Sequence, residues 1–245
     1  EKNLAICLGT NGFSFSVVST RQELLTIGEV QLPDFTSLAE GILCLKQAMA
    51  QLNVPTTGLA SAQLVVNADL SVWVPDSLYE PSKERAALGA VCSIPTGQAV
   101  MSDHNEEMQS RVIFACDNTW VPAFKIAVPN IKVRCQHSRF VNPVTLGMSS
   151  HNNMILVHVR EGKGDYEVLS NQKLQLSNTF DCASFDEVVY HTINLSKQLH
   201  IADSELEVVL CGDVNRDQAG MMCQFFPRVN LYKGSSVTVN TPELA

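Results

Sequence analysis

Glycine-containing turns supply the residues of this chain that are best suited to chemistry. Gly9-Thr10-Asn11-Gly12 follows an apolar run near the start, and Gly162-Lys163-Gly164 follows another in the second half. Backbone N–H groups in such turns, with a lysine beside them, can hold phosphate. Glycine also serves hairpin turns that need a positive φ angle, and Gly12 and Gly164 suit that role. The residues therefore leave two interpretations, phosphate binding and plain turn formation.

A second candidate is a pair of metal ligands. Cys135 and His137 are separated by one residue in a segment predicted as a strand, so they share one face and could bind a metal ion. A closed site needs two more ligands, and no suitably spaced residues supply them. A structural role is therefore favoured for both side chains, and no metal site is predicted.

A third candidate is an acid/base cluster formed by Asp103 and His104 with Glu106 and Glu107. These residues lie at a polar tip between strands predicted at 98–103 and 111–116, which favours a solvated loop. The common motifs of serine hydrolases, Walker nucleotide sites and zinc proteases are missing from the sequence. No catalytic residue is predicted.

The turns sit inside a pattern that occurs twice, at residues 4–67 and 154–212. Each copy is predicted as three strands, a helix and a further strand, and each helix is preceded by a Ser-x-x-Glu capping box. These boxes are Ser37–Glu40 and Ser184–Glu187. Three antiparallel strands followed by a helix and a parallel strand form an α/β half-domain. Two such halves predict a cleft between them, where a ligand would bind.

The pattern also predicts the domain organisation. Residues 1–150 form a first lobe with an insertion around 68–110, and residues 151–245 form a second lobe. The strand–helix–strand segment at 112–133 is predicted to correspond to 208–231. Short helices are predicted at 140–148 and 216–226.

Composition restricts the classes of partner. The 245 residues carry a net charge of −8 without a basic run, which argues against nucleic-acid binding. No apolar stretch reaches the roughly 20 residues of a membrane span. The eight cysteines form no Cys-x-x-Cys pair and mostly lie in apolar runs, so free thiols and a cytoplasmic location are expected.

Several segments together resemble a known group of proteins. They are residues 4–18, 73–89, 128–138, 176–199 and 208–213. The chain resembles the actin, Hsp70 and sugar-kinase group of ATPases, which contain paired ribonuclease-H-like halves. It resembles more closely an uncharacterised bacterial family, domain of unknown function 3822. This resemblance implies a two-lobed actin-like ATPase fold without an established activity.

The resemblance also implies three nucleotide-binding loops. The first corresponds to residues 7–10, where Cys7 stands in place of the expected aspartate. The second corresponds to 158–164, where His158 or Arg160 takes the carboxylate position, and the third, at 211–213, keeps one glycine. If a nucleotide binds, the implied contacts are Gly9, Thr10, Asn11, Gly12, Gly162, Lys163, Gly164, Gly212 and Asp213.

These substitutions determine the predicted function. A magnesium-dependent ATPase needs carboxylates to hold the metal and to orient the attacking water. The chain is therefore predicted to be non-catalytic, a protein-binding or assembly scaffold with a degenerate nucleotide cleft and no resident cofactor. The alternative is a divergent ATPase or phosphotransferase that binds ATP and Mg²⁺ between the lobes. Four large side chains, Met221, Met222, Phe225 and Phe226, indicate either core on two sides of a helix or a groove for a protein partner.

Overall fold

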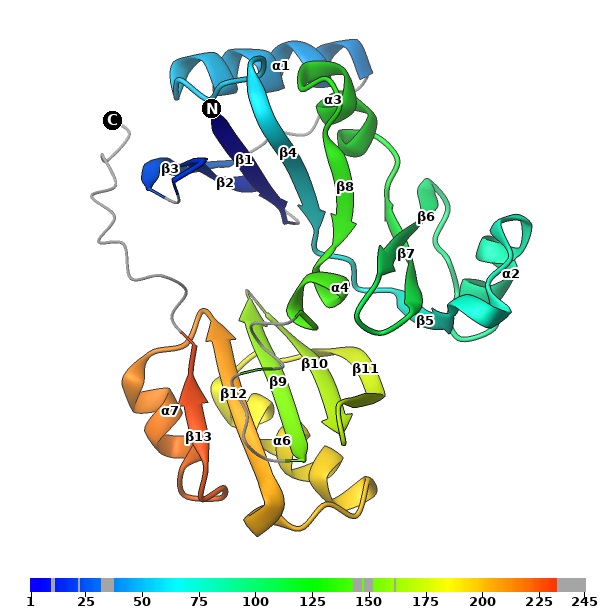
Figure 1. Cartoon of the computed structure of the whole chain (residues 1–245), viewed down its shortest axis with the longest axis vertical. Helices are drawn as coiled ribbons and strands as arrows, with labels where there is room; N and C mark the ends of the chain where they lie inside the picture. The colour runs from blue at the N-terminus through cyan, green and yellow to red at the C-terminus, as the bar shows by residue number, and fades with distance from the viewer. Residues whose placement is uncertain are drawn as a thin grey trace.

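The chain folds into two lobes that lie one above the other (Figure 1). The computed structural model describes residues 1–9, 12–21, 23–31, 38–142, 147, 152–160 and 162–232. Thr10 and Asn11 of the first turn, and the predicted helix cap Ser37, lie outside these residues.

The first lobe is built on a five-stranded sheet. Its order is β3-β2-β1-β4-β8, with β1 antiparallel to β2 and parallel to β4. In chain order the strands are Lys2–Leu8 (β1), Gly12–Ser19 (β2), Leu24–Gln31 (β3), Leu59–Val66 (β4) and Lys132–Cys135 (β8).

The second lobe repeats this arrangement. Its sheet has the order β11-β10-β9-β12-β13, in which β9 is again antiparallel to the following strand and parallel to the one after the helix. The strands are Asn153–Arg160 (β9), Lys163–Ser170 (β10), Lys173–Asp181 (β11), Leu206–Gly212 (β12) and Val229–Leu231 (β13). The fold is the predicted α/β architecture, with two ribonuclease-H-like halves of matching strand order.

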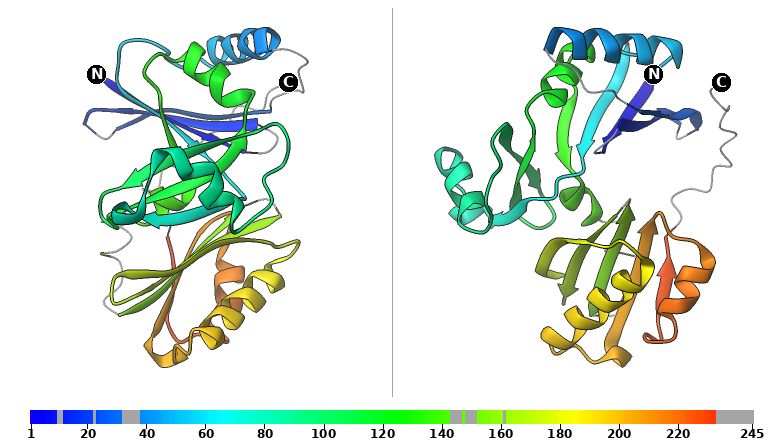
Figure 2. Two further views of the ribbon diagram at one scale, coloured as in Figure 1. Left: turned by 90° about the vertical axis from the view of Figure 1, so that its right-hand side faces the viewer. Right: turned by 180° about the vertical axis from the view of Figure 1, so that it is seen from behind.

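Helices cover the outer face of each sheet. In both views of Figure 2, α1 and α3 lie on the side of the first sheet that is turned away from the second lobe, while α6 lies on the opposite outer side of the molecule. The helices are Leu38–Gln51 (α1), Trp120–Ala127 (α3), Phe185–Gln198 (α6) and Arg216–Met222 (α7), and a 3₁₀ turn, Asp203–Glu205 (η3), precedes β12.

Alternating side chains explain why the first sheet packs against its helices. Phe13, Phe15 and Val17 on β2 are buried, as their period of two predicts, and they join the same apolar core as Leu45 of α1. The Phe13 ring meets Phe124 of α3 edge to face, with centroids 5.2 Å apart. The hydrophobic pattern thus fixes which face of the sheet remains for the other lobe.

The predicted capping box of α6 is not formed. Ser184 is the N-cap residue, but its side chain makes no capping hydrogen bond. The Glu187 carboxylate accepts the N–H of Ala183 at 2.6 Å, one residue before the cap. The acidic side chain therefore binds a backbone donor just before the helix and leaves both bonds of the capping box unmade.

A small three-stranded sheet is inserted after β4. Its order is β5-β7-β6, formed by Ser71–Pro75 (β5), Gln98–Asn105 (β6) and Ser110–Asp117 (β7). Helix α2 (Glu84–Gly89) packs on it, after two 3₁₀ turns at Asp76–Leu78 and Pro81–Lys83. The predicted match of strand 112–116 to strand 208–211 is wrong, because β7 belongs to this inserted sheet and β4 holds the place of β12. Only α3 and β8 correspond to α7 and β13.

The connection between the lobes begins with helix α4, Gln136–Phe140, which follows β8 directly. It ends at the residue where the helix predicted for 140–148 begins, and most of that predicted helix lies outside the described residues. Within the described chain, the backbone passes from the first lobe to the second once, between α4 and β9. An apolar cluster covers this joint, where Trp73 and Met108 pack with Met154 and Leu156.

All eight cysteines are free thiols. Among the described residues, no helix is long and apolar enough to cross a membrane.

Candidate functional site

The two glycine-containing hairpins meet at a cavity of about 510 Å³ between the lobes. The β1–β2 side contributes Cys7, Gly9 and Gly12, and the β9–β10 side contributes Arg160 and Lys163. Gly9 closes its turn by donating its N–H to the carbonyl oxygen of Gly12 at 2.9 Å. The fold therefore brings together residues that lie about 150 positions apart in the sequence, which is the spacing of the repeat.

The other predicted contact residues lie apart from this cavity. Gly212 lines a separate, mainly apolar cavity of about 340 Å³ with Phe140, Leu156 and Tyr232. Asp213 is exposed, and its N–H donates to the carbonyl oxygen of Val159. Gly162 and Gly164 flank Lys163 in the second hairpin and line neither cavity.

The glycines have different structural roles. Gly12 and Gly164 do not adopt a positive φ angle, contrary to the turn interpretation. Gly12 is required because a Cβ atom there would lie 2.1 Å from the carbonyl oxygen of Val30. Gly162 and Gly212 do have positive φ angles, of 67° and 84°. Gly12 is thus required by close approach of the backbone, Gly162 by its positive φ angle, and Gly212 by both, since a Cβ atom there would lie 2.2 Å from the Val159 carbonyl oxygen.

Cys7 occupies the end of β1, where the resemblance leads one to expect an aspartate. Its Sγ donates a hydrogen bond to Oδ1 of Asn67, at the end of β4, over 3.4 Å. Burial raises the pKa of this thiol, which keeps it protonated at neutral pH. The position therefore carries no negative charge.

The two cations at the cavity are paired with carboxylates of the chain. Arg160 Nη2 lies 2.6 Å from Asp69 Oδ1, and Lys163 Nζ lies 3.4 Å from Asp69 Oδ2 and 2.5 Å from Asp181 Oδ1. Asp69 follows β4 in the first lobe, so it bridges two cations of the second lobe. The hydrogen bond from Lys163 holds the pKa of Asp181 below its usual value.

A buried carboxylate, Asp165, lies behind these pairs. It is 1% exposed and is held by Arg160 Nε at 3.0 Å, His158 Nδ1 at 3.1 Å and the Thr179 hydroxyl at 2.6 Å. Burial alone would raise its pKa, but the hydrogen bond from His158 and the charges of His137 and Arg160 outweigh this and hold the pKa well below the usual range. Asp165 is therefore an ionised, fully engaged group.

A buried histidine–carboxylate pair joins the lobes next to Asp165. His137 Nδ1 is hydrogen-bonded to Glu167 Oε1, and both residues are completely buried. His137 Nε2 lies 3.1 Å from the Thr179 hydroxyl. Burial lowers the pKa of His137, but the charge and hydrogen bond of Glu167 outweigh it, so the pKa is raised. Among the described residues, Glu167 Oε2 has no hydrogen-bond partner.

This geometry corrects the predicted strand pair of Cys135 and His137. The strand ends at Cys135, and His137 lies in α4, so the two side chains do not share a strand face. Within the described part of the chain, no group of three His, Cys, Asp or Glu side chains is placed to hold a metal ion.

The structure also differs from the prediction for the polar tip between β6 and β7. Asp103 is 2% exposed, because β6 continues to Asn105 and packs beside β8. Its carboxylate accepts from Arg134 Nη1 at 2.6 Å and from the Cys135 N–H at 3.0 Å, and it also accepts from the Ser138 hydroxyl. His104 instead pairs with Asp76 at 2.8 Å. Asp103 is thus a structural anchor for α4 and not part of a solvated loop.

Comparison with known proteins places the chain in a family. A family model described as "Protein of unknown function (DUF3822)" matches residues 1–224. The chain belongs to this family. No curated protein matches the chain.

Solved structures share the fold. A Bacteroides thetaiotaomicron protein with an actin-like ATPase fold and unknown function has a TM-score of 0.80 at 18% identity, over 94% of this chain and 90% of that one. A chain of the PilM–PilN type IV pilus biogenesis complex has a TM-score of 0.55 at 12% identity, covering 94% and 88%. The ethanolamine utilization protein EutJ from Carboxydothermus hydrogenoformans has a TM-score of 0.51 at 10% identity, covering 94% and 84%. This DUF3822 member therefore has the two-lobed actin-like ATPase fold.

Sequence reasoning missed Asp165 and Glu167, which are the central charges of the joint. A signal was present, because two carboxylates separated by one residue in a strand lie on the same face. Their neighbours Tyr166 and Val168 are buried on the other face. A strand with two carboxylates on a face covered by another lobe must supply partners for them.

The methionines and phenylalanines of α7 and the following turn divide between core and surface. Met222 and Phe226 are fully buried, as the core interpretation requires. Met221 is 37% exposed and Phe225 is 50% exposed. Met221 in α7 and Phe225 in the turn after it are therefore both exposed large apolar side chains.

Proposed function

We propose that this chain is a non-catalytic, protein-binding scaffold whose inter-lobe nucleotide cleft is degenerate. The observation that carries the proposal is the pairing of both cavity cations, Arg160 and Lys163, with Asp69. A bound triphosphate would have to displace this carboxylate before either cation could neutralise phosphate charge. Each such exchange replaces one ion pair with another and gains little free energy.

The donor set of the cavity also fits Mg²⁺ poorly. Mg²⁺ prefers oxygen ligands, usually carboxylates, together with its own water molecules. Cys7 presents a protonated thiol at this cavity, and Asp165 is engaged by Arg160, His158 and Thr179. No step of ATP hydrolysis is therefore assigned to these residues. If a nucleotide does bind, the nine residues implied by the resemblance are the proposed contacts.

A protein partner is supported by exposed apolar side chains. Met221 of α7 and Phe225 of the turn that follows it are both exposed on the second lobe. The chain from the PilM–PilN complex, whose fold this chain shares, was solved together with a protein partner. We place the scaffold in the cytoplasm, because all eight cysteines are free thiols.

One observation favours the alternative, a divergent ATPase or phosphotransferase. Arg160 and Lys163 line the same cavity as Gly9 and Gly12. A glycine turn that faces two cations can hold phosphate once Asp69 is displaced.

Titration with ATP, with and without Mg²⁺, separates the two functions. We expect no Mg²⁺-dependent turnover and no difference between the wild type, Gly9→Ala and Lys163→Met. A Cβ atom at position 9 meets only ordinary contacts, so Gly9→Ala tests the turn without disturbing the fold. Gly89→Ala, in open space on α2, is the matched control. Turnover that Gly9→Ala and Lys163→Met abolish, while Gly89→Ala retains it, would overturn the scaffold function.

A further inference from the structure

Helix α4 places one side chain, His137, against the polar face of the hairpin formed by β10 and β11. In this hairpin Glu167 lies opposite Ser177 and Asp165 lies opposite Thr179, and opposite residues of an antiparallel pair share one face. The Ser177 hydroxyl donates to Glu167 Oε1 at 3.0 Å, and the Thr179 hydroxyl donates to Asp165 Oδ1 at 2.6 Å. Two pairs, each of a carboxylate and a hydroxyl, thus face one buried imidazole.

These hydrogen bonds assign the protons of His137. Asp165 is ionised and only accepts, so the single hydroxyl proton of Thr179 is directed to it. The Thr179 oxygen is left to accept from Nε2 of His137, 3.1 Å away, and Nε2 must therefore carry a proton. Nδ1 donates to the Glu167 carboxylate. The ring is therefore protonated at both nitrogens.

Loss of one proton turns this contact from attraction into repulsion. Nε2 keeps its proton because Thr179 offers it an acceptor, so Nδ1 becomes a lone pair that faces Oε1 of Glu167. Ser177 would then be the remaining donor to Oε1, and Oε2 has no partner among the described residues. A completely buried carboxylate without a counter-ion is far less stable than one in water. The contact of α4 with β10 therefore depends on that proton.

The contacts that hold α4 to the first lobe include two amide side chains, which do not titrate. Gln136 donates to the Ala68 carbonyl oxygen at 2.6 Å and accepts the Ala68 N–H at 2.8 Å. Asn105 of the inserted sheet donates to the Ser138 carbonyl oxygen at 2.9 Å. These bonds keep α4 in place on the first lobe while His137 titrates.

The charges that act on His137 come from the second lobe. Burial lowers its pKa, whereas the charge and hydrogen bond of Glu167 and the charge of Asp165 raise it, and the charge of Arg160 opposes them. Burial raises the pKa of the Cys135 thiol well above its usual value, so this neighbour stays neutral. The net effect on His137 is a raised pKa, which places the loss of its proton above about pH 6.5.

Other titratable side chains lie on α4 and on the strands around it, whereas β4 has none. They are Arg139 of α4, Asp103 and His104 of β6, Arg111, Cys116 and Asp117 of β7, Lys132 and Arg134 of β8, His158 of β9, Lys163 and Tyr166 of β10, and Lys173 and Asp181 of β11.

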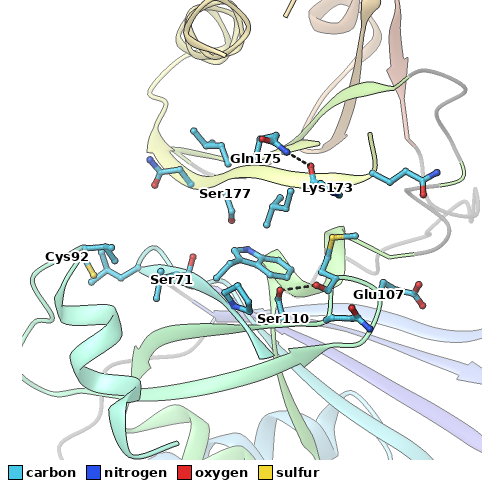
Figure 3. Close-up of a pocket in the computed structure, with 18 of the residues that line it drawn as sticks. Ser71, Cys92, Glu107, Ser110, Lys173, Gln175 and Ser177 are labelled. Atoms are coloured by element: carbon cyan, nitrogen blue, oxygen red, sulfur yellow. Dashed lines mark hydrogen bonds between the residues drawn. The ribbon is translucent and has the colours of Figure 1, made fainter. Parts of the chain in front are cut away.

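The buried pair lies beside a slot that is open to solvent. The slot has a volume of about 880 Å³ and lies between the inserted sheet and β11, where Ser177 belongs to the strand of the upper wall (Figure 3). The same Ser177 binds Glu167, so one side chain lies between the slot and the buried carboxylate. Trp73 lines the slot and packs in the apolar cluster with Met154 of the second lobe. Its indole therefore reports on the contact between the lobes.

We propose that the His137–Glu167 pair is a proton-dependent latch between α4 and the second lobe. The latch is closed while both ring nitrogens carry protons. After one proton passes to solvent, α4 separates from β10 and β11, and water from the slot reaches Glu167. Because the closed form holds one more proton, the opening constant rises up to about tenfold per pH unit above about pH 6.5, until the raised pKa of the closed form is passed. This inference goes beyond the proposed function and does not depend on it.

The test uses the full chain with Trp120→Phe, which leaves Trp73 as its one tryptophan. Acrylamide quenching of Trp73 is measured between about pH 6 and pH 9, a range that includes the pKa of an exposed imidazole. Ring protonation of His137 is followed by NMR of its Cε1–H group, assigned by the loss of this signal in His137→Leu. Glu167→Gln, made in the same background, is the matched control. Its amide pairs with Nδ1 whether or not the ring is charged, so the latch stays closed.

We expect the quenching constant of Trp73 to rise at least about twofold over this range as the open form becomes the major one. The midpoint should coincide with the titration of His137, and Glu167→Gln should show no such rise. The double variant His137→Leu, Glu167→Leu is a second control, which keeps the test valid if Glu167→Gln does not fold.

Three results would overturn the latch. The first is quenching that rises equally in the parent protein and in the controls. The second is a His137 ring that loses its proton while quenching stays constant. The third is a ring that is already neutral at about pH 6, or still protonated at about pH 9, because neither state would change over the measured range.

Discussion

Arg160 Nη2 lies 2.6 Å from Asp69 Oδ1, and the same guanidinium contacts the buried Asp165 through its Nε at 3.0 Å. A side chain of the second lobe thus connects a carboxylate of the first lobe with one of its own. The two contacts differ in strength, because the Asp69 side chain is 47% exposed whereas that of Asp165 is buried. Solvent screens the first pair, and the second is protected from it.

Replacing Asp69 with asparagine should increase anion binding at the inter-lobe cavity. The substitution removes the negative charge that faces both Arg160 and Lys163. We expect pyrophosphate to bind about threefold to tenfold more tightly, with a loss of stability below about 1 kcal/mol because the pair is screened. Isothermal titration calorimetry measures the affinity. Asp181→Asn, which releases only Lys163 at an exposed site, is the control, and equal affinities for all three proteins would contradict the prediction.

Replacing Asp165 with asparagine should destabilise the fold strongly. The change leaves Arg160 and His158 without their buried carboxylate. Removing one partner of a buried charge pair costs about 3–5 kcal/mol. Urea unfolding followed by circular dichroism measures this loss, and a loss below about 1 kcal/mol would show that solvent reaches the site.

Asp165 should also make stability depend on acidity. Its pKa in the folded chain is lower than in the unfolded chain, so its contribution is complete above the unfolded value of about 3.9 and is lost as the pH falls. Between about pH 5 and pH 3, the wild type should therefore lose stability more steeply than Asp165→Asn. Parallel slopes for the two proteins would be inconsistent with an ionised Asp165.

The His137–Glu167 pair should cost more to break than to replace. His137→Leu alone leaves a buried carboxylate unpaired, at a cost of about 3–5 kcal/mol. The double variant His137→Leu, Glu167→Leu should recover at least half of that loss, because two apolar side chains need no partners. Urea unfolding of both single variants and the double variant completes the cycle, and additive losses would argue against direct coupling.

The same pair has a pH signature of opposite sign to that of Asp165. The folded-state pKa of His137 is raised, so its contribution is complete below the unfolded value of about 6.5 and is lost as the pH rises through the folded value. The wild type should lose stability with rising pH above about 6.5, relative to the double leucine variant. A difference between the two proteins that does not vary with pH would refute a protonated His137.

Two glycines should respond oppositely to alanine. Gly212 has a φ angle of 84°, and a Cβ atom there would lie 2.2 Å from the Val159 carbonyl oxygen. Gly212→Ala should therefore lose about 2 kcal/mol or more. Gly220 lies in α7 with open space around its Cα, so Gly220→Ala should gain about 0.5–1 kcal/mol. Thermal unfolding measures both, and a stable Gly212→Ala protein would contradict the close contact.

Local patterns predict much of this fold because they are set by periodicity. The alternation of Phe13, Phe15 and Val17 identifies the buried face of a strand, and the repeat predicts two matching sheets. Helix α4 was missed because its five residues are too few for an apolar stripe to appear. The burial of Asp103 was missed because its partner Arg134 lies 31 residues away in the sequence.

The site was less predictable than the fold for the same reason. The glycine turns could be located from sequence, and the repeat brings Gly9 and Lys163 to one cavity. The neutralisation of Lys163 by Asp69 depends on the docking of two lobes, over 94 residues of chain that no local pattern describes.

The single crossing of the backbone between α4 and β9 has a mechanical consequence. Within the described chain, no second covalent strand fixes the orientation of one lobe relative to the other. Among the described residues, rotation about this point is resisted by contacts between side chains, namely the apolar cluster around Met154 and the charges around Arg160 and His137. Among the described residues, these contacts between side chains therefore carry the resistance to a change in the angle between the lobes.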